Sequence, residues 1–199
     1  MGLDTNNVGQ AVFGFKTRAT GNVSFASGYR NTAAGTASVA MGNFNYATGD
    51  SSVAIGKNSY AQGASSIAIG FKAHAAGGGS VALGQENVSW GSTNFTSGYQ
   101  NIAGDVTANA GTGGSAVAMG KYNTASADAS MALNRGTSAT NQAATAMGFR
   151  TIADNAGMLA IGVNNAVGEG DTVSGRYFYT DGAYNLSLIH ISEPTRRKR

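Results

Sequence analysis

The sequence predicts an all-β solenoid of about eleven stacked coils, because three features recur every fourteen residues. A glycine marks each repeat, alanines stand two positions before it and five positions after it, and large apolar residues stand one and three positions before it. Units this short cannot bury a core alone and have to stack on one another. The marking glycines are Gly14, Gly28, Gly42, Gly56, Gly70, Gly84, Gly98, Gly120, Gly148 and Gly162, with Asn134 in the remaining place.

The stretch before Gly56 illustrates how each coil is expected to begin. Side chains alternate between the two faces of a β-strand, so Val53 and Ile55 share one face and Ala54 takes the other. The alanines five positions after each glycine, such as Ala61, indicate a second short strand in the same coil. We expect the two alanine columns to face each other across a thin interior.

A second glycine, seven residues after the first, divides each coil into two halves. We expect both glycines at corners where the chain takes a positive φ, which glycine adopts without steric cost. Asp105, Asn141 and Asn155 replace the second glycine at three places, and we interpret them as residues that tolerate the left-handed region. The serines that precede the first strand, among them Ser52, are expected to be small residues at the strand start.

Large apolar side chains cannot fit between two alanine walls, so they are expected in a stripe along the outside of one sheet. A soluble monomer rarely exposes so long an apolar patch, and the stripe therefore predicts a partner, most simply another copy of the chain. The residues expected at this interface are Val39, Met41, Val53, Ile55, Ile67, Ile69, Val81, Leu83, Val117, Met119, Leu133, Met147, Leu159 and Ile161.

The pattern Ser-Val-Ala-Ile-Gly-x-x-Ser-x-Ala-x-Gly resembles the head repeat of trimeric autotransporter adhesins, also called the haemagglutinin/invasin-type repeat, over about 160 of the 199 residues. The resemblance implies a left-handed parallel β-roll that assembles as a homotrimer with the apolar stripe at its core. It also implies display at the bacterial outer membrane and cell surface, adhesion to extracellular matrix or to host or bacterial cells, and a role in virulence. A phage or phage-like tail fibre that contacts a receptor through similar repeats is the alternative.

The sequence lacks the residue patterns of several kinds of site. Cysteine is absent, and no acid, histidine or serine recurs in a way that would build a nucleophile and its base. The aspartate column of calcium-binding solenoids and the paired carboxylates of polysaccharide-cleaving enzymes are also missing. We therefore expect no enzyme activity, no cofactor and no metal site. No apolar run reaches the roughly 18 residues of a membrane-spanning helix, so a membrane is expected only through a C-terminal anchor outside this chain.

Three features depart from the regular pattern. His74 shares a column with Tyr46 and Tyr60 and is expected to be a surface side chain without a metal role. Trp90 is interpreted either as an exposed ligand contact or as packing beneath an insertion. The insertion, at about residues 104–115, is either a neutral bulge or a loop that carries specific binding.

We place the β-roll head repeats in residues 1–168, and a connector or the start of a truncated next module in residues 169–185. Residues 186–199 are interpreted as an artefact, because Leu186 to Arg196 resembles a translated sequencing adapter. Four basic residues and one acid lie in that segment, so without it the net charge falls from +3 to 0. The pI of about 9.3 therefore does not indicate a nucleic-acid partner. The opening residues lack the features of a signal peptide, and we expect the natural protein to begin earlier.

Overall fold

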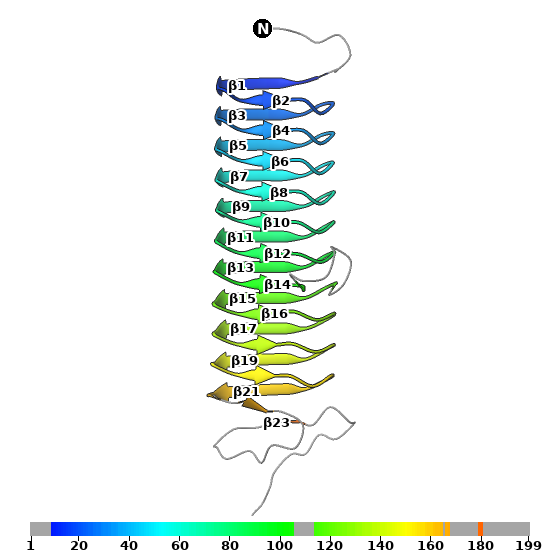
Figure 1. Cartoon of the computed structure of the whole chain (residues 1–199), viewed down its shortest axis with the longest axis vertical. Coiled ribbons are helices and arrows are strands. Elements are labelled where there is room, and N and C mark those ends of the chain that lie inside the picture. The colour runs from blue at the N-terminus through cyan, green and yellow to red at the C-terminus, as the bar shows by residue number, and fades with distance from the viewer. Residues whose placement is uncertain (1–8, 106–113, 165, 168–178, 181–199) are drawn as a thin grey trace, which may run out of the picture.

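The computed structural model describes residues 9–105, 114–164, 166–167 and 179–180, and every regular element in them is a β-strand. A strand of five residues and a strand of two residues alternate along one axis (Figure 1). The five-residue strands are β1 (Ala11–Phe15), β3 (Phe25–Tyr29), β5 (Val39–Asn43), β7 (Val53–Lys57), β9 (Ile67–Phe71), β11 (Val81–Gln85), β13 (Phe95–Tyr99), β15 (Val117–Lys121), β17 (Met131–Arg135), β19 (Thr145–Phe149) and β21 (Leu159–Val163). The two-residue strands are β2 (Arg18–Ala19), β4 (Thr32–Ala33), β6 (Tyr46–Ala47), β8 (Tyr60–Ala61), β10 (His74–Ala75), β12 (Val88–Ser89), β14 (Ile102–Ala103), β16 (Thr124–Ala125), β18 (Ser138–Ala139), β20 (Ile152–Ala153), β22 (Ala166–Val167) and β23 (Tyr179–Thr180).

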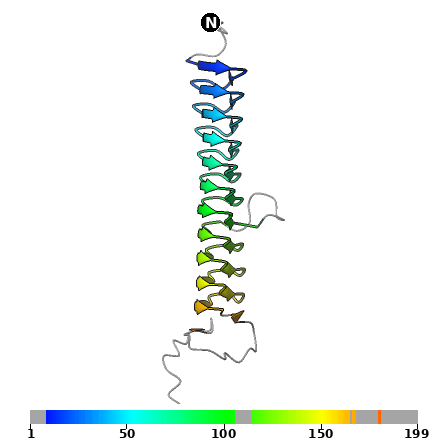
Figure 2. The same ribbon diagram turned by 90° about the vertical axis from the view of Figure 1, so that its left-hand side faces the viewer.

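The long strands form one parallel sheet, which β23 extends at its end, and the short strands from β2 to β22 form another; each sheet follows the order of the coils. Residues fourteen positions apart pair, as Val53 does with Ile67 and Ile55 with Ile69. Strand β23 runs the other way and pairs antiparallel with β21. Seen from the side, the two sheets lie close together and the roll is narrow (Figure 2). The predicted all-β parallel solenoid is thus confirmed, whereas its handedness and its trimeric assembly remain predictions.

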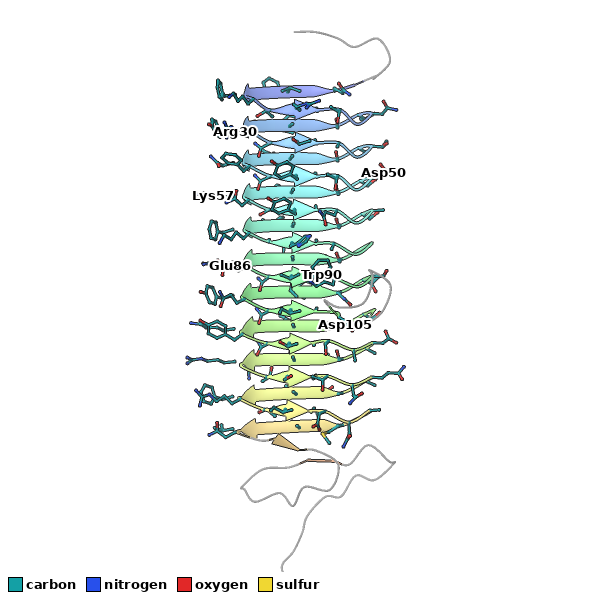
Figure 3. The ribbon with its side chains drawn as sticks, viewed as in Figure 1. Arg30, Asp50, Lys57, Glu86, Trp90 and Asp105 are labelled. Atoms are coloured by element: carbon teal, nitrogen blue, oxygen red, sulfur yellow. The ribbon has the colours of Figure 1, made fainter. Side chains whose placement is uncertain are left out.

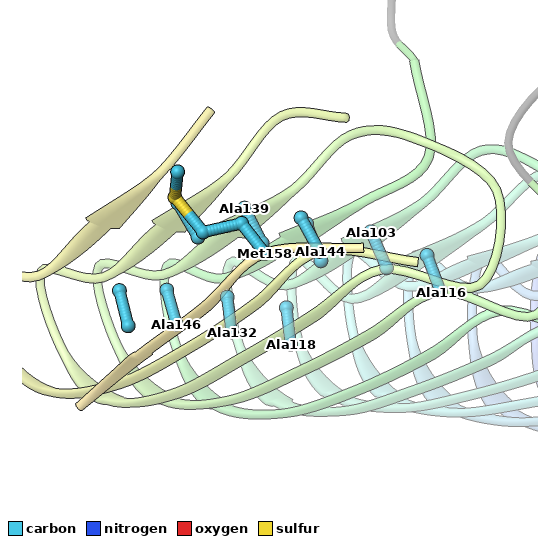
Figure 4. Close-up of a cluster of buried hydrophobic side chains, with 11 residues drawn as sticks. Ala103, Ala116, Ala118, Ala132, Ala139, Ala144, Ala146 and Met158 are labelled. Carbon is cyan, nitrogen blue, oxygen red and sulfur yellow. The ribbon is translucent and has the colours of Figure 1, made fainter. Parts of the chain in front are cut away.

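The interior of the roll is lined by alanine. Alanines of both predicted columns are buried, and Figure 4 shows Ala118, Ala132 and Ala146 following one another along one wall. Thr96 and Ser89 take the place of one alanine in each column, and their hydroxyl oxygens lie 2.9 Å apart in a buried hydrogen bond. This polar pair separates the alanines into two clusters. The burial confirms the prediction of which face lies inside.

The residue before each long strand from β3 to β21 is also buried, as expected for a small residue at a strand start. The hydroxyl groups of Ser24 and Ser80 donate to the carbonyl oxygens of Gly21 and Gly77, at 2.6 and 2.7 Å. Met158 occupies the same place in the last coil and is 2% exposed, so the interior there holds a larger side chain (Figure 4).

The two glycines of a coil lie at its two corners for different reasons. Gly56, of the first kind, has a φ of +121°, and a Cβ on it would lie 2.0 Å from the carbonyl oxygen of Gly70. Gly63, of the second kind, does not lie in the left-handed region, but a Cβ on it would lie 2.0 Å from the carbonyl oxygen of Gly77. The predicted positive φ is therefore right for the first glycine and wrong for the second, where Gly63 is instead selected by the close approach of the next coil.

The interpretation of Asp105, Asn141 and Asn155 as left-handed replacements is also wrong, because none of the three has a positive φ. They stand in for the second glycine, whose place does not require that conformation. Asn134 replaces a glycine of the first kind and does have a positive φ, of 86°. The other left-handed places lie two residues after each glycine and are filled mostly by residues with side chains, such as Ser65 with a φ of 57°.

A column that contains buried amide side chains lies three residues after the first glycine, and each of these amides joins its coil to a neighbouring one. The amide nitrogen of Asn45 donates to the carbonyl oxygens of Met41 and Gly56, both at 2.7 Å. Its side-chain oxygen accepts a hydrogen bond from the backbone N–H of Ser59 at 2.9 Å. The buried asparagines of this column are Asn31, Asn45, Asn87, Asn101 and Asn123. This column was not predicted from the sequence.

The predicted insertion lies between β14 and β15 and leaves the register of the coils intact. Phe95 pairs with Val117, and Ile102 pairs with Thr124, each across a step of twenty-two residues. Residues 106–113 lie outside the described residues, and both interpretations of the insertion therefore remain predictions. The same holds for the connector apart from β23, and for residues 186–199.

Candidate functional site

The outward face of the long strands carries the predicted apolar stripe. The side chains stand in register from coil to coil, and none of the expected interface residues is buried. Ile69, Met119 and Ile161 are 37%, 42% and 42% exposed, although each belongs to a residue type that usually lies inside a protein. The stripe therefore lies outside the roll, as predicted, and its role as an interface remains a prediction.

The stripe is continuous over most of the roll but has polar interruptions. Ser27, Ser97 and Thr145 take places in its two columns. At the N-terminal end the stripe is aromatic, with the rings of Phe13 and Phe25 5.9 Å apart. A straight apolar stripe along the whole axis can be covered by an elongated partner that lies parallel to the roll.

The corner that follows each long strand gathers the positive charges, and we call this edge the cationic corner. Seven of the eight lysines and arginines among the described residues stand here, one or two positions after the first glycine, and the one acid among them is Glu86. The seven are Lys16, Arg30, Lys57, Lys72, Lys121, Arg135 and Arg150. Figure 3 shows Arg30, Lys57 and Glu86 projecting along this edge, with Asp50 on the opposite edge. We call the opposite edge, residues 63–65 and their equivalents, the small-residue corner.

Aromatic rings separate the cations at the first half of the cationic corner. The guanidinium carbon of Arg30 lies 5.4 Å from the ring centre of Tyr29 and 5.1 Å from that of Phe44. Phe71 in turn lies between two lysines, with the Nζ atoms of Lys57 and Lys72 at 5.8 and 5.2 Å from its ring centre. Contacts of this kind stabilise a surface cation by about 0.5–1 kcal/mol each.

The same alternation continues after the insertion. The Nζ atom of Lys121 lies 5.1 Å from the ring centre of Tyr99 and 4.9 Å from that of Tyr122. The guanidinium carbons of Arg135 and Arg150 lie 5.4 and 5.2 Å from the ring centre of Phe149. Rings and cations thus alternate along the edge, and the rings hold the charged groups in defined positions.

Glu86 is the anionic exception at this edge. Its carboxylate lies 3.4 Å from the Nζ atom of Lys72 and accepts a hydrogen bond from the side-chain amide of Gln100. The hydrogen bond from Gln100 and the charge of Lys72 lower the pKa of Glu86, so this side chain stays ionised at neutral pH. It offsets one of the seven positive charges.

The outward face of the short strands carries a second aromatic column. The rings of Tyr46 and Tyr60 stack at 5.1 Å, and His74 meets Tyr60 edge-on at 5.9 Å. Trp90 packs edge-on against His74 at 5.1 Å and is half-buried, and its relation to residues 106–113 lies outside the described residues. His74 is placed as a side chain packed at the surface, its Nε2 atom 2.9 Å from Oε1 of Gln62, and burial lowers its pKa.

The described residues do not form a metal site or a membrane-spanning helix. Within residues 9–105, 114–164, 166–167 and 179–180, no group of three or more His, Cys, Asp or Glu side chains could hold a metal ion. The same residues contain no helix that is long and apolar enough to cross a membrane.

Comparison with known families assigns the repeat. The sequence model of the YadA head domain repeat, a unit of two copies, matches residues 19–45, 33–59, 47–72, 61–87 and 112–133. The first four matches begin fourteen residues apart, which is the register of the two sheets. A search of curated proteins found no match.

Proposed function

We propose that this chain, a module built of YadA head domain repeats and of the trimeric autotransporter adhesin type, assembles as a homotrimer and works as an adhesion module at the bacterial cell surface. The exposed apolar stripe is the single observation that supports the proposed assembly. Its residues run straight along the roll axis, so copies can cover one another's stripes when they lie side by side with parallel axes. Burying such a patch stabilises the assembly by about 25 cal/mol for each Å² of apolar surface removed from water.

The proposed adhesive role rests on what the trimer would leave outside. Apolar side chains at the axis would leave the corners and the short-strand faces of three rolls facing solvent. These surfaces repeat the same side-chain pattern from coil to coil and therefore suit a ligand that is itself extended, such as a matrix protein or a cell-surface polymer. The family assignment supports surface display, which we propose here for this chain.

A tail fibre of a phage or phage-like particle remains the second candidate. The same parallel roll and the same apolar stripe would serve a fibre that contacts a receptor, because both kinds of protein need a long, stiff and oligomeric shaft. The two candidates differ in the neighbouring genes. Genes for tail assembly would support the fibre, and a longer reading frame that ends in a membrane anchor would support the adhesin.

The assembly is tested by placing charges in the stripe. Ile55 and Ile69 pair in adjacent coils, and the double change Ile55→Asp with Ile69→Asp should give a folded monomer, because like charges would converge without solvent at the axis. Light scattering measures the mass, which should be three times 20.0 kDa for the unchanged chain and 20.0 kDa for the variant. An unchanged trimer in the variant would contradict the proposal that the stripe forms the interface.

The matched control places the same two charges on the other sheet. Thr124 and Ser138 also pair in adjacent coils, on the outward face of β16 and β18, and both are half-buried. Thr124→Asp with Ser138→Asp introduces the same repulsion within a chain but should leave the trimer intact. Dissociation in both variants would indicate that the charges disturb the coils rather than the interface.

A further inference from the structure

We propose that the cationic corner binds a linear sulfated polysaccharide. This inference names a ligand class for the adhesion module proposed above, and it rests on that proposed function for its setting. The observation behind it is the separation of charge in the roll. Seven exposed cations and one acid stand along a single straight edge, whereas the opposite edge carries no lysine or arginine among the described residues.

The spacing of the cations suits a long polymer. Neighbouring coils of a β-sheet lie about 4.8 Å apart, so the cations from Lys16 to Arg150 extend over roughly 43 Å. Cations in adjacent coils lie within the screening length of about 8 Å at physiological ionic strength and act on a bound polyanion together. Sulfate groups recur along an extended polysaccharide at short intervals, and each can accept hydrogen bonds from lysine or arginine.

Neither folding nor solubility requires this arrangement. Lys72 and Ser65 occupy equivalent left-handed places at the two corners, with φ values of 53° and 57°, so the backbone does not select for a cation. A soluble surface is served by charges of both signs mixed together, whereas a row of like charges repels itself. The aromatic rings between the cations hold them in place against that repulsion, as Phe71 does between Lys57 and Lys72.

The packing of the rings favours a polysaccharide over a nucleic acid. Binding of single strands needs open aromatic faces on which bases can stack. Here the rings contact each other or are covered by cations: Phe15 stacks on Tyr29 at 5.5 Å and Lys16 lies 5.3 Å from the ring centre of Phe15. A duplex carries its phosphates on a helical path and would meet a straight edge at intervals only. An extended sulfated chain can follow the whole edge.

Binding of heparin to the full chain tests the proposal. The chain should bind heparin with an affinity that falls steeply as salt rises, and it should not bind the neutral polymer dextran. The double change Lys57→Gln with Lys72→Gln should weaken heparin binding about tenfold, at roughly threefold for each cation removed. The control, Ser51→Asp with Ser65→Asp, lowers the net charge by the same two units at the small-residue corner and should stay within about twofold of the unchanged chain.

Two outcomes would overturn the proposed ligand class. Equal losses in the two variants would mean that net charge alone attracts heparin, and equal affinity for duplex DNA would mean that the edge does not select a sulfated polymer. Light scattering on the same samples separates this inference from the assembly. A trimer that fails to bind heparin overturns the ligand class alone, whereas a monomer that binds it through Lys57 and Lys72 overturns the trimer alone.

Discussion

The two corners of each coil share two backbone features but carry different side chains. At both corners the next coil approaches so closely that most coils have a glycine there, as at Gly56 and Gly63 in one coil. At both corners the residue two places later takes a left-handed conformation. At the cationic corner that place and the one before it hold mainly lysine, arginine and aromatic residues, and at the small-residue corner they hold mainly serine, alanine, threonine and glycine.

This difference separates what the fold needs from what the surface presents. Most coils hold a glycine at both corners, and both corners contain a left-handed place, which is filled by Val23 and Ser65 as well as by Arg30 and Lys72. The side chains chosen there are therefore free to serve a partner. Three changes, taken from the largest expected effect to the smallest, test this comparison.

The largest effect is expected from the glycine of the small-residue corner. A Cβ on Gly77 would lie 2.1 Å from the carbonyl oxygen of Gly91, so Gly77→Ala should push two coils apart and lower the free energy of unfolding by more than about 4 kcal/mol. Gly79 lies in the same turn, where a Cβ would meet only Thr93 at 3.5 Å. Ala37 already occupies the equivalent place with a φ of 55°.

Gly79→Ala is therefore the control and should change stability by no more than about 0.5 kcal/mol. Denaturant unfolding at equal protein concentration compares the two variants. Similar midpoints for both would show that close approach of the coils is not what selects the glycine.

A smaller loss is expected at the buried amide next to the cationic corner. Asn45→Ala removes an amide that donates to two carbonyl oxygens and to Oδ1 of Asn31 and that accepts from one backbone N–H, and should cost about 3 kcal/mol, at roughly 1 kcal/mol for each of its two N–H groups and its one acceptor oxygen. Asn43, two positions earlier, lies on the outward face and is half-buried. Asn43→Ala should have an effect below about 0.5 kcal/mol, and equal shifts in melting temperature would count against a structural role for the amide column.

The smallest effect is expected from moving a cation to the other corner. Ser65→Lys places a lysine in a left-handed position where Lys72 shows that the conformation is accessible, and stability should change by no more than about 0.5 kcal/mol. Thermal unfolding followed by circular dichroism measures the change. A loss above about 1 kcal/mol would show that folding requires small side chains at the small-residue corner. It would then contradict the view that the backbone accepts a cation equally at both corners.

Much of the fold could be predicted from the sequence, because a strict period converts each column into one physical environment. Nine alanines before the marking glycine can only mean a place without room, and the structure buries them. The prediction for the second glycine was wrong because two different constraints select glycine. A positive φ selects it, and so does a close approach of another part of the backbone. Only the neighbouring coil, which the sequence does not place, distinguishes the two.

The surfaces were predicted less completely. The amide column was not predicted because Ser59, Ala73 and Thr137 interrupt it, so no single residue type recurs there in the sequence. The cationic corner was not predicted for a related reason. Its cations alternate between two neighbouring positions, as Lys57 and Lys72 do, and neither position by itself contains a row of charges. The turn brings both positions to one edge.

The direction of the hydrogen bonds between coils has a mechanical consequence. Bonds such as those from Val53 N–H to the Ser66 carbonyl oxygen and from Thr48 N–H to the Ala61 carbonyl oxygen run along the roll axis, both at 2.9 Å. A pull along that axis loads the coils in series, so they detach one at a time from an end and the force at which they yield does not grow with their number. Each coil that detaches exchanges about 4.8 Å of rise for roughly 45 Å of extended chain. A tethered roll can therefore lengthen under load and dissipate energy while the remaining coils keep their shape.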